Sequence, residues 1–351
     1  MRAAVLVADR RIEIEDLPDP VPGPGEVLIV PAYASICGTD EHVFAGEFAG
    51  RVHHPLIQGH EFCGTVAALG AGVHDLAVGD RVAVDPIVPC GRCPACLIGR
   101  MNGCQSLKLL GVDLPGGFAT RVVAAAHSCF RVPPALAMRD AVLTEVYSIG
   151  CHATRRAQVD PGDVVVVLGA GKLGQAVLEN IRHTAARLVI VTDLVPERLA
   201  NATALGADVV IDVSREDAVR RVLDLTGGAG ADRVLECVGH ARLVGPNPAE
   251  PMTQAAEMVR AAGRVVVLGQ GPVPAPILFK PFVWKEAEII ASRVTLGEFP
   301  RALAMLADGW FHPERLITHR LPLERAAEGY RLLADPSQRA LKLILEINPP
   351  T

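Results

Sequence analysis

The residues whose types and spacing most clearly predict a chemical role are four cysteines in the first third of the chain. Cys90, Cys93, Cys96 and Cys104 follow a Cys-x2-Cys-x2-Cys-x7-Cys spacing. Four thiolates at such spacing complete a tetrahedral zinc site and leave no position for a substrate. The spacing therefore predicts a closed, structural zinc site in a lobe at about residues 88–106. An iron–sulfur cluster and a set of unrelated core cysteines are the alternatives.

A second pair of possible metal ligands precedes this lobe. Cys37 begins a Cys-Gly-Thr-Asp run, and His60 lies between Gly59 and Glu61. Thiolate and imidazole are both usual ligands of zinc. A lone histidine is more often a hydrogen-bonded structural residue, but the neighbouring glycines allow the backbone to pass close to another group. The pair therefore predicts a second, catalytic zinc ion, which needs a third protein ligand from elsewhere.

A glycine-rich run follows an apolar strand further along the chain. The run is Gly169-Ala170-Gly171-Lys172-Leu173-Gly174. Glycines at this spacing, between a strand and a helix, allow close approach to a pyrophosphate, and the helix N-terminus supplies N–H groups. Asp193 ends the next predicted strand, where a carboxylate binds the ribose hydroxyls of NAD and repels the 2′-phosphate of NADP. The alternative for Asp193 is a helix N-cap. Arg198 either stacks near the adenine or is a solvated helix residue.

The elements that must position these residues differ between two parts of the chain. Up to about residue 130, short alternating strands and turns rich in Gly and Pro predict an irregular β-rich domain. From about residue 161, apolar strands alternate with helices, which predicts an α/β fold with a doubly wound parallel sheet covered on both faces. The predicted strands are 164–168, 188–192, 208–211, 233–237 and 264–268, and the predicted helices are 174–185, 196–205, 215–225 and 253–262.

The last part of the chain predicts a return to the first domain. It holds two predicted helices, at 299–306 and 323–333, and a closing strand at 341–345. The proline-rich run at 272–276 is predicted to be a stiff loop.

Composition excludes several classes of partner. A length of 351 residues favours two domains. The net charge is −5, with Lys and Arg scattered, so no nucleic-acid partner is expected. No apolar run approaches the roughly 18 residues of a membrane span, and no signal peptide is recognisable, so we expect a cytoplasmic protein without a membrane partner. Nine cysteines in such a protein favour metal binding over disulfides.

These motifs together resemble one enzyme family. The run Gly59-His60-Glu61-x2-Gly64-x5-Gly70-x2-Val73 is similar to the signature of the zinc-containing medium-chain alcohol dehydrogenases. The Cys-Gly-Thr-Asp run, the four-cysteine lobe and the glycine-rich run resemble the same family, in the same order, over essentially the whole chain. The resemblance implies a GroES-like catalytic domain at 1–148, an NAD-binding Rossmann domain at 149–291 and a C-terminal return at 292–351.

The resemblance also implies the missing zinc ligand. In the polyol (sorbitol-like) and threonine dehydrogenase branches the third ligand is a glutamate, and Glu145 lies close to that position. Cys151 is the alternative. The branches usually place proline after the glutamate, whereas this chain has Val146. Zinc with one thiolate, a neutral histidine and one carboxylate carries no net charge. A further carboxylate ligand from Glu61 would make the site anionic, so Glu61 is implied to be a residue beside the metal or an exchange ligand.

Three further residues are implied to move or orient protons. Thr39 matches the relay hydroxyl of the family, and His42 matches the relay histidine of several members. Asp40 is implied to orient His60 through the second ring nitrogen. Helix capping by Thr39 or Asp40, and an exposed position for His42, are the alternatives.

The implied function is oxidation of a secondary alcohol (a polyol, sugar alcohol or sugar acid) to a ketone, with hydride transfer to NAD and two zinc ions per chain. L-Threonine 3-dehydrogenase, or another small amino or diol alcohol dehydrogenase, is the alternative. A zinc-free reductase or a relative without enzymatic activity would lack the pair Cys37 and His60. A homodimer or homotetramer, paired through edge strands of the coenzyme domain, is also implied by the resemblance.

Overall fold

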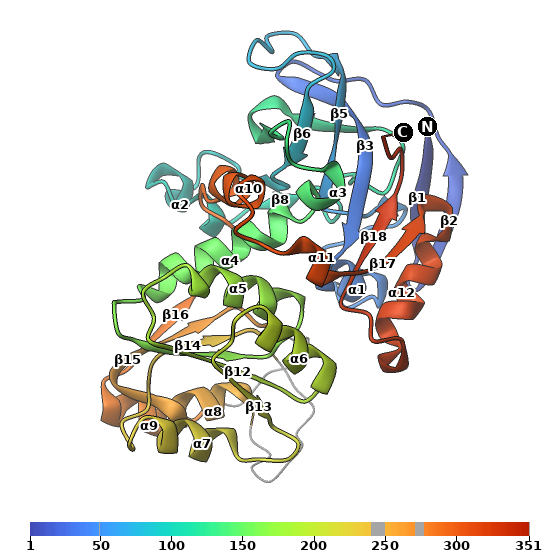
Figure 1. Ribbon diagram of the computed structural model, residues 1–351. Helices are drawn as coiled ribbons and strands as arrows, with labels where there is room; N and C mark the ends of the chain where they lie inside the picture. Colours follow the sequence, from blue (N-terminus) through green and yellow to red (C-terminus); the bar gives the residue numbers. More distant parts are fainter. Residues whose placement is uncertain (49, 240–249, 271–276, 351) are drawn as a thin grey trace. The chain divides into compact units, whose positions relative to one another are not determined.

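The computed structural model describes residues 1–48, 50–239, 250–270 and 277–350, which form two compact units (Figure 1). Unit 1 comprises Met1–Glu145 and Phe299–Thr351, and unit 2 comprises Val146–Glu298. The predicted loop at 272–276 lies outside the described residues. Within the described part, no helix has the length and apolar character needed to cross a membrane.

Unit 1 is built mainly from strands. Its first segment contains β1 (Arg2–Ala8), β2 (Arg11–Asp16), β3 (Glu26–Ile36), α1 (Gly38–Phe44), β4 (Leu56–Ile57), β5 (Glu61–Leu69), β6 (Arg81–Val84), β7 (Ile87–Val88), α2 (Pro94–Leu97), η1 (Met101–Gly103), β8 (Lys108–Leu109), β9 (Val122–Ala125), η2 (Ala126–Ser128), β10 (Cys129–Arg131) and α3 (Met138–Ala141). Its C-terminal segment contains α10 (Phe299–Ala307), α11 (Pro313–Leu316), β17 (Ile317–Pro322), η3 (Leu323–Arg325), α12 (Ala326–Ala334), η4 (Pro336–Gln338) and β18 (Lys342–Glu346).

The sheets of unit 1 join its two segments. Among the described residues, the largest sheet has the order β10-β6-β5-β3-β18-β17, and β9 also pairs with β3. β18 runs antiparallel to β3, so the last strand of the chain lies beside the strand that leads into Cys37. Alternate side chains of these strands enter a core that includes Ile29, Phe62 and Leu345.

Unit 2 alternates strands and helices. It contains most of α4 (Thr144–Ala157), then β11 (Val164–Leu168), α5 (Lys172–Arg182), β12 (Leu188–Asp193), α6 (Pro196–Ala204), β13 (Val209–Asp212), α7 (Ala218–Leu225), β14 (Ala231–Glu236), α8 (Pro251–Met258), β15 (Val259–Val267), α9 (Phe279–Lys285) and β16 (Glu288–Ala291).

The sheet of unit 2 is parallel throughout its described part, in the order β13-β12-β11-β14-β15-β16. Figure 1 shows α5 on one face of this sheet and α7, α8 and α9 on the other. Numbered within the unit, the strand order is 3-2-1-4-5-6, which is that of dinucleotide-binding folds. The predicted doubly wound parallel sheet is therefore confirmed.

Two details of the sequence prediction were wrong. The predicted helix at 253–262 ends at Met258, and β15 begins at the next residue, where the β-branched Val259 is buried in the sheet core. The tail was predicted to hold two helices and one strand, but it also contains α11 and β17. β17 was missed because half-buried and exposed residues alternate around His319 and Arg320, which gave no apolar run.

Candidate metal centres and coenzyme site

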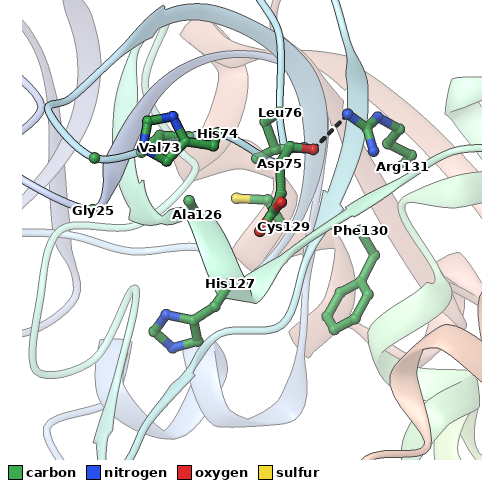
Figure 2. Close-up of a pocket in the computed structure, with 11 residues that line it drawn as sticks. Gly25, Val73, His74, Asp75, Leu76, Ala126, His127, Cys129, Phe130 and Arg131 are labelled. Atoms are coloured by element: carbon green, nitrogen blue, oxygen red, sulfur yellow. Dashed lines mark hydrogen bonds between the residues drawn. The ribbon is translucent and has the colours of Figure 1, made fainter.

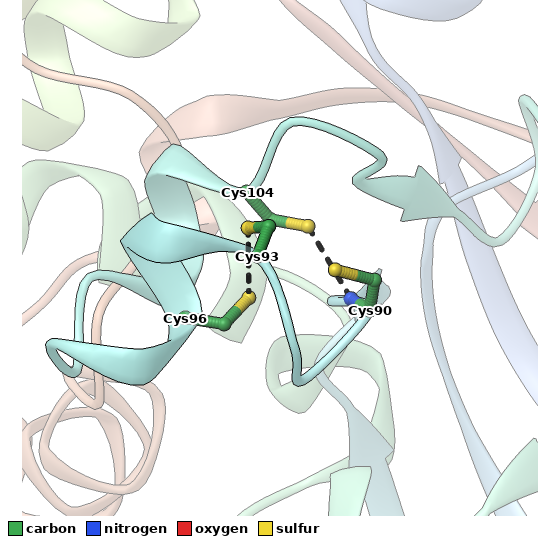
Figure 3. A group of neighbouring side chains, drawn as sticks. All are labelled: Cys90, Cys93, Cys96 and Cys104. Carbon is green, nitrogen blue, oxygen red and sulfur yellow. Dashed lines mark hydrogen bonds between the residues drawn. The ribbon is translucent and has the colours of Figure 1, made fainter.

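The four cysteines of the lobe converge on one point. Their sulfur atoms all lie within 4.8 Å of one another, and Figure 3 shows the side chains directed toward a common centre. The sulfurs of Cys93 and Cys96 are 3.6 Å apart, close to the spacing that two ligands of one tetrahedral zinc require. Cys93 precedes the proline that starts α2, and the backbone N–H of Cys90 donates to the sulfur of Cys104.

The charges of this cluster fit a dication. Backbone N–H groups of Cys96 and Gln105 lower the pKa of Cys93 to about 6. Burial and the neighbouring thiols raise the pKa of Cys96 to about 12. Four sulfurs so close together cannot all ionise without a cation, and a bound zinc ion would deprotonate them.

The second candidate metal centre combines two strands and the start of a helix. Ligand atoms of Cys37, His60 and Glu61 lie within 4.8 Å of one another. Cys37 follows β3 and precedes α1, while His60 and Glu61 stand at the start of β5. A thiolate, an imidazole and a carboxylate form a donor set that suits zinc. Gly59 has a positive φ and packs against Phe118, because an added Cβ there would lie 2.3 Å from the Phe118 ring.

Asp40 connects the two halves of this centre. One carboxylate oxygen accepts the backbone N–H of Cys37 at 2.8 Å, and the other accepts that of Gly59 at 3.2 Å. The second oxygen also lies 3.5 Å from Nδ1 of His60, slightly beyond an ordinary hydrogen bond. Asp40 is therefore both a cap of α1 and a neighbour of His60, the two roles considered from the sequence. This arrangement leaves Nε2 of His60 as the nitrogen for a metal.

Glu145 lies close enough to the same centre to interact electrostatically with Glu61 and His60. Its side chain is 5% exposed, and burial together with the charge of Glu61 raises its pKa to about 8. A carboxyl group of this kind holds its proton until a cation replaces it. Glu145 does not belong to the compact group of three ligand atoms. The thiol of Cys151, the alternative ligand, donates to Asn180 at 2.9 Å within unit 2.

A buried lysine next to Glu61 was not identified from the sequence. Lys342, on β18, donates to Glu61 at 2.6 Å, and both residues are 0% exposed. Ser35 also donates to Glu61. Burial alone would lower the pKa of the Lys342 ammonium, but Glu61 and Cys37 outweigh burial and raise it. Burial raises the pKa of Glu61 and Lys342 lowers it, and the net shift is downward. The pair is therefore charged.

A second missed contact also comes from the C-terminal segment. Tyr330 of α12 donates to the side-chain oxygen of Gln58 at 2.9 Å, and the Gln58 amide donates to the backbone oxygen of Asp40 at 3.1 Å. The ring of Tyr330 stacks on that of Phe44. The position of Asp40 therefore depends on a residue near the end of the chain.

The two predicted relay residues lie on α1. Both are half-buried: Thr39 lies in the first turn, and His42 lies in the last turn with its side chain 39% exposed. His42 forms an ion-pair contact with Glu47.

The glycine-rich run of unit 2 has the geometry of a phosphate-binding turn. Gly169 has φ 91°, and Gly171 precedes α5, whose first two residues are Lys172 and Leu173. A Cβ on Gly174 would lie 1.8 Å from the backbone oxygen of Gly169, so only glycine allows this packing.

Asp193 holds the same turn in place. One carboxylate oxygen accepts the N–H of Ala170 at 2.7 Å, and the other accepts those of Leu194 and Val195 at 2.8 Å. Arg198 lies 4.0 Å from the carboxylate. A carboxylate has about four acceptor positions, so one remains for a ribose hydroxyl. Asp193 is therefore both a structural acceptor and a candidate ligand of the ribose.

A surface pocket of about 510 Å³ in unit 1 is lined by Val73, the last residue of the family signature, but by none of the candidate metal ligands (Figure 2). Its histidines, His74 and His127, are exposed, and Arg131 is engaged by Asp80 and by the backbone of Asp75. Neither histidine belongs to a metal-ligand group among the described residues. We assign no chemistry to this pocket.

Comparison with known proteins identifies the family. Residues 23–134 match the alcohol dehydrogenase GroES-like domain, and residues 173–308 match the zinc-binding dehydrogenase family. Sorbitol dehydrogenase of Bacillus subtilis is 32% identical over 99% of this chain and 98% of the relative. 2-Dehydro-3-deoxy-L-galactonate 5-dehydrogenase of Pseudoalteromonas atlantica is 31% identical over 99% of both chains. An alcohol dehydrogenase of Escherichia coli CFT073, complexed with NADH, has a TM-score of 0.90 and 31% identity over 99% of both chains.

The chain belongs to the zinc-binding, GroES-like alcohol dehydrogenase family. It is an enzyme that acts on alcohols with zinc and a nicotinamide dinucleotide. The family resemblance drawn from the sequence motifs is thus confirmed, and a relative without enzymatic activity is disfavoured.

Proposed function

We propose that this enzyme oxidises a secondary alcohol of a polyol, sugar alcohol or sugar acid to a ketone and transfers the hydride to NAD. The observation that carries the proposal is the convergence of Cys37, His60 and Glu61 on one centre, in a chain related over its length to sorbitol and sugar-acid dehydrogenases. The alternative, L-threonine oxidation, has no comparable support among these relatives.

We assign the two zinc ions to separate sets of residues. Cys90, Cys93, Cys96 and Cys104 hold the structural ion. Cys37, His60 and Glu145 hold the catalytic ion, with Glu61 beside it. The raised pKa of Glu145 and the engagement of Cys151 by Asn180 support this choice of third ligand.

A zinc ion held by these residues would supply Lewis acidity toward the substrate hydroxyl, and a bound nicotinamide would supply the hydride acceptor. The protein residues position the metal ligands and move the proton. Asp40 accepts the backbone N–H of Cys37, and its carboxylate lies 3.5 Å from Nδ1 of His60, where it would orient the ring once the ring binds the metal. In this proposal Thr39 passes the hydroxyl proton toward His42 in the last turn of α1, whose partly exposed ring releases it to solvent.

NAD is the proposed coenzyme. Asp193 presents a carboxylate with remaining acceptor capacity at the end of β12, where a 2′-phosphate would be repelled. Solved relatives contain NADH in one case and NADP in another, so the preference depends on this chain's own residues. Comparison of kcat/KM with NAD⁺ and NADP⁺ tests the assignment, and a preference for NADP⁺ would contradict it.

The substrate class is tested by a screen for NADH production with sugar alcohols, aldonates, L-threonine and simple secondary alcohols. The highest kcat/KM is expected with a polyol or an aldonate. A clear preference for threonine or a simple alcohol would refute the proposed class and leave the enzyme class intact.

We also propose a cytoplasmic homodimer or homotetramer. β16 is one of the two edge strands in the described part of the unit 2 sheet, and an exposed edge can pair with a second copy. The clustered cysteines suit a reducing compartment. Light scattering of the purified protein tests the oligomeric state, and a monomer at micromolar concentration would contradict it.

A further inference from the structure

One charged residue close to the metal centre comes from the far end of the chain. Lys342 is the first residue of β18 and is 0% exposed. Its ammonium contacts both oxygens of the Glu61 carboxylate. Lys342 lies beyond the two regions that match family models, which end at residues 134 and 308.

Strand pairing explains why this lysine reaches the centre. On one side of β3, Ser35 is opposite Ile344 of β18, and on the other side it is opposite Glu61 of β5. Residues opposite each other in a sheet share a face, and so do residues two apart in one strand. Lys342, Ser35 and Glu61 therefore project from the same face of three adjacent strands. This geometry places the ammonium and the hydroxyl on one carboxylate.

The charge of Lys342 changes the electrostatic balance of the centre. A zinc ion with Cys37 thiolate and the Glu145 and Glu61 carboxylates would carry one excess negative charge. The buried ammonium restores neutrality. Without it, the zinc ion would be the strongest positive charge available to Glu61, whose ligand atom already lies within 4.8 Å of those of Cys37 and His60.

We propose that Lys342 is a positioning residue of the zinc site, which holds the Glu61 carboxylate off the metal so that one coordination position stays open to the substrate hydroxyl. This role rests on the catalytic zinc site proposed above. It gives the C-terminal strand a part in catalysis through Glu61, without contact with substrate. Ser35 supports the same position of the carboxylate from β3.

Lys342→Gln tests the proposal because it removes the charge and keeps a hydrogen-bond donor. In this variant Glu61 is expected to bind the metal and close the open position. We expect kcat to fall by about 10–100-fold, the size typical of residues that orient metal ligands. The zinc ion of this centre should be lost more slowly to a chelator such as dipicolinate. The absorption spectrum of the cobalt-substituted protein should change, because an added carboxylate alters the coordination.

Two comparisons assign the effect to the charge and to Glu61. Lys342→Arg keeps the charge and should retain the wild-type cobalt spectrum. In a Glu61→Gln background, Lys342→Gln should leave the spectrum unchanged, since no carboxylate remains to be held. The four-cysteine site is the same in every variant, so difference spectra isolate the other centre.

Two results would overturn the proposal. The first is an unchanged cobalt spectrum or faster zinc loss in Lys342→Gln. The second is an equal spectral change with and without Glu61, which would indicate a merely structural lysine. If Lys342→Gln alone does not fold, Glu61→Gln and the double variant are compared, and a spectral difference between them refutes the proposal. A wild-type protein that binds only one cobalt ion would instead refute the catalytic zinc site itself.

Discussion

The two candidate metal centres of unit 1 are built in opposite ways. The four-cysteine cluster takes its ligands from residues 90–104, and its geometry follows from local turns and one short helix. The other centre draws on three strands, a helix and the C-terminal segment. Its ion pair between Lys342 and Glu61 joins residues 281 positions apart, and its hydrogen bond between Tyr330 and Gln58 joins residues 272 positions apart. A local centre can stabilise one lobe, whereas a dispersed centre depends on the whole unit and can be tuned from many positions.

The largest expected effect comes from removing a ligand of the dispersed centre. Cys37→Ser should lose one zinc ion per chain and keep the other. Lewis-acid stabilisation contributes several kcal/mol, and about 4 kcal/mol corresponds to roughly 10³-fold in rate, so kcat should fall by at least about that factor. Metal analysis and steady-state kinetics measure both effects. Loss of both zinc ions would show that the two centres are not independent.

The second test compares the two candidate third ligands. Glu145→Ala should reduce kcat by about 10²-fold or more and release one zinc ion, because the carboxylate is assigned to the metal. Cys151→Ser is the matched control: the thiol it replaces contacts Asn180 in unit 2, and it should keep both ions and most activity. The opposite pattern would assign the ligand to Cys151.

The third test addresses the local centre. Cys96→Ser should release the structural zinc, whose binding free energy contributes to folding, and should leave the kcat of the remaining folded protein near normal. The melting temperature should fall by about 2–4 °C for each kcal/mol of stability lost. Cys129→Ser changes a buried thiol outside the lobe and serves as the control with both zinc ions retained. A large fall in kcat at full folding would contradict the structural role.

The smallest expected effect concerns the second long-range contact. Tyr330→Phe leaves the buried side-chain oxygen of Gln58 without its donor, which costs about 1–3 kcal/mol of unfolding free energy. Tyr147→Phe removes a comparable buried hydrogen bond, to Glu179 in unit 2. Urea unfolding should show similar losses for both variants, and only Tyr330→Phe should accelerate zinc loss. Equal zinc retention would remove Tyr330 from the support of the metal centre.

The same contrast explains what could be predicted from the sequence. The four-cysteine spacing, the glycine-rich run and the alternation of apolar strands and helices are local patterns, and they were enough for the fold class and the family. Lys342 was counted only as part of a closing strand. Its signal is a single charge inside the apolar run of residues 341–345, all buried in the structure. Only the pairing of β18 with β3 shows which carboxylate it meets. Such pairings depend on chain topology, which a local pattern does not contain.

The charge argument about Glu61 also changed with the structure. From the sequence, a second carboxylate near zinc would make the site anionic. The buried ammonium of Lys342 removes that objection, so Glu61 can lie beside the metal as a permanent member of a neutral cluster. The position of Glu61, not its charge, then decides whether the metal keeps an open site.

The zinc content of the purified wild-type protein tests the central claim most directly. Two separate centres predict two zinc ions per chain, one of which is lost in Cys37→Ser and the other in Cys96→Ser. A wild-type protein with one zinc ion, held by the four cysteines and unaffected by Cys37→Ser, would contradict the catalytic zinc centre.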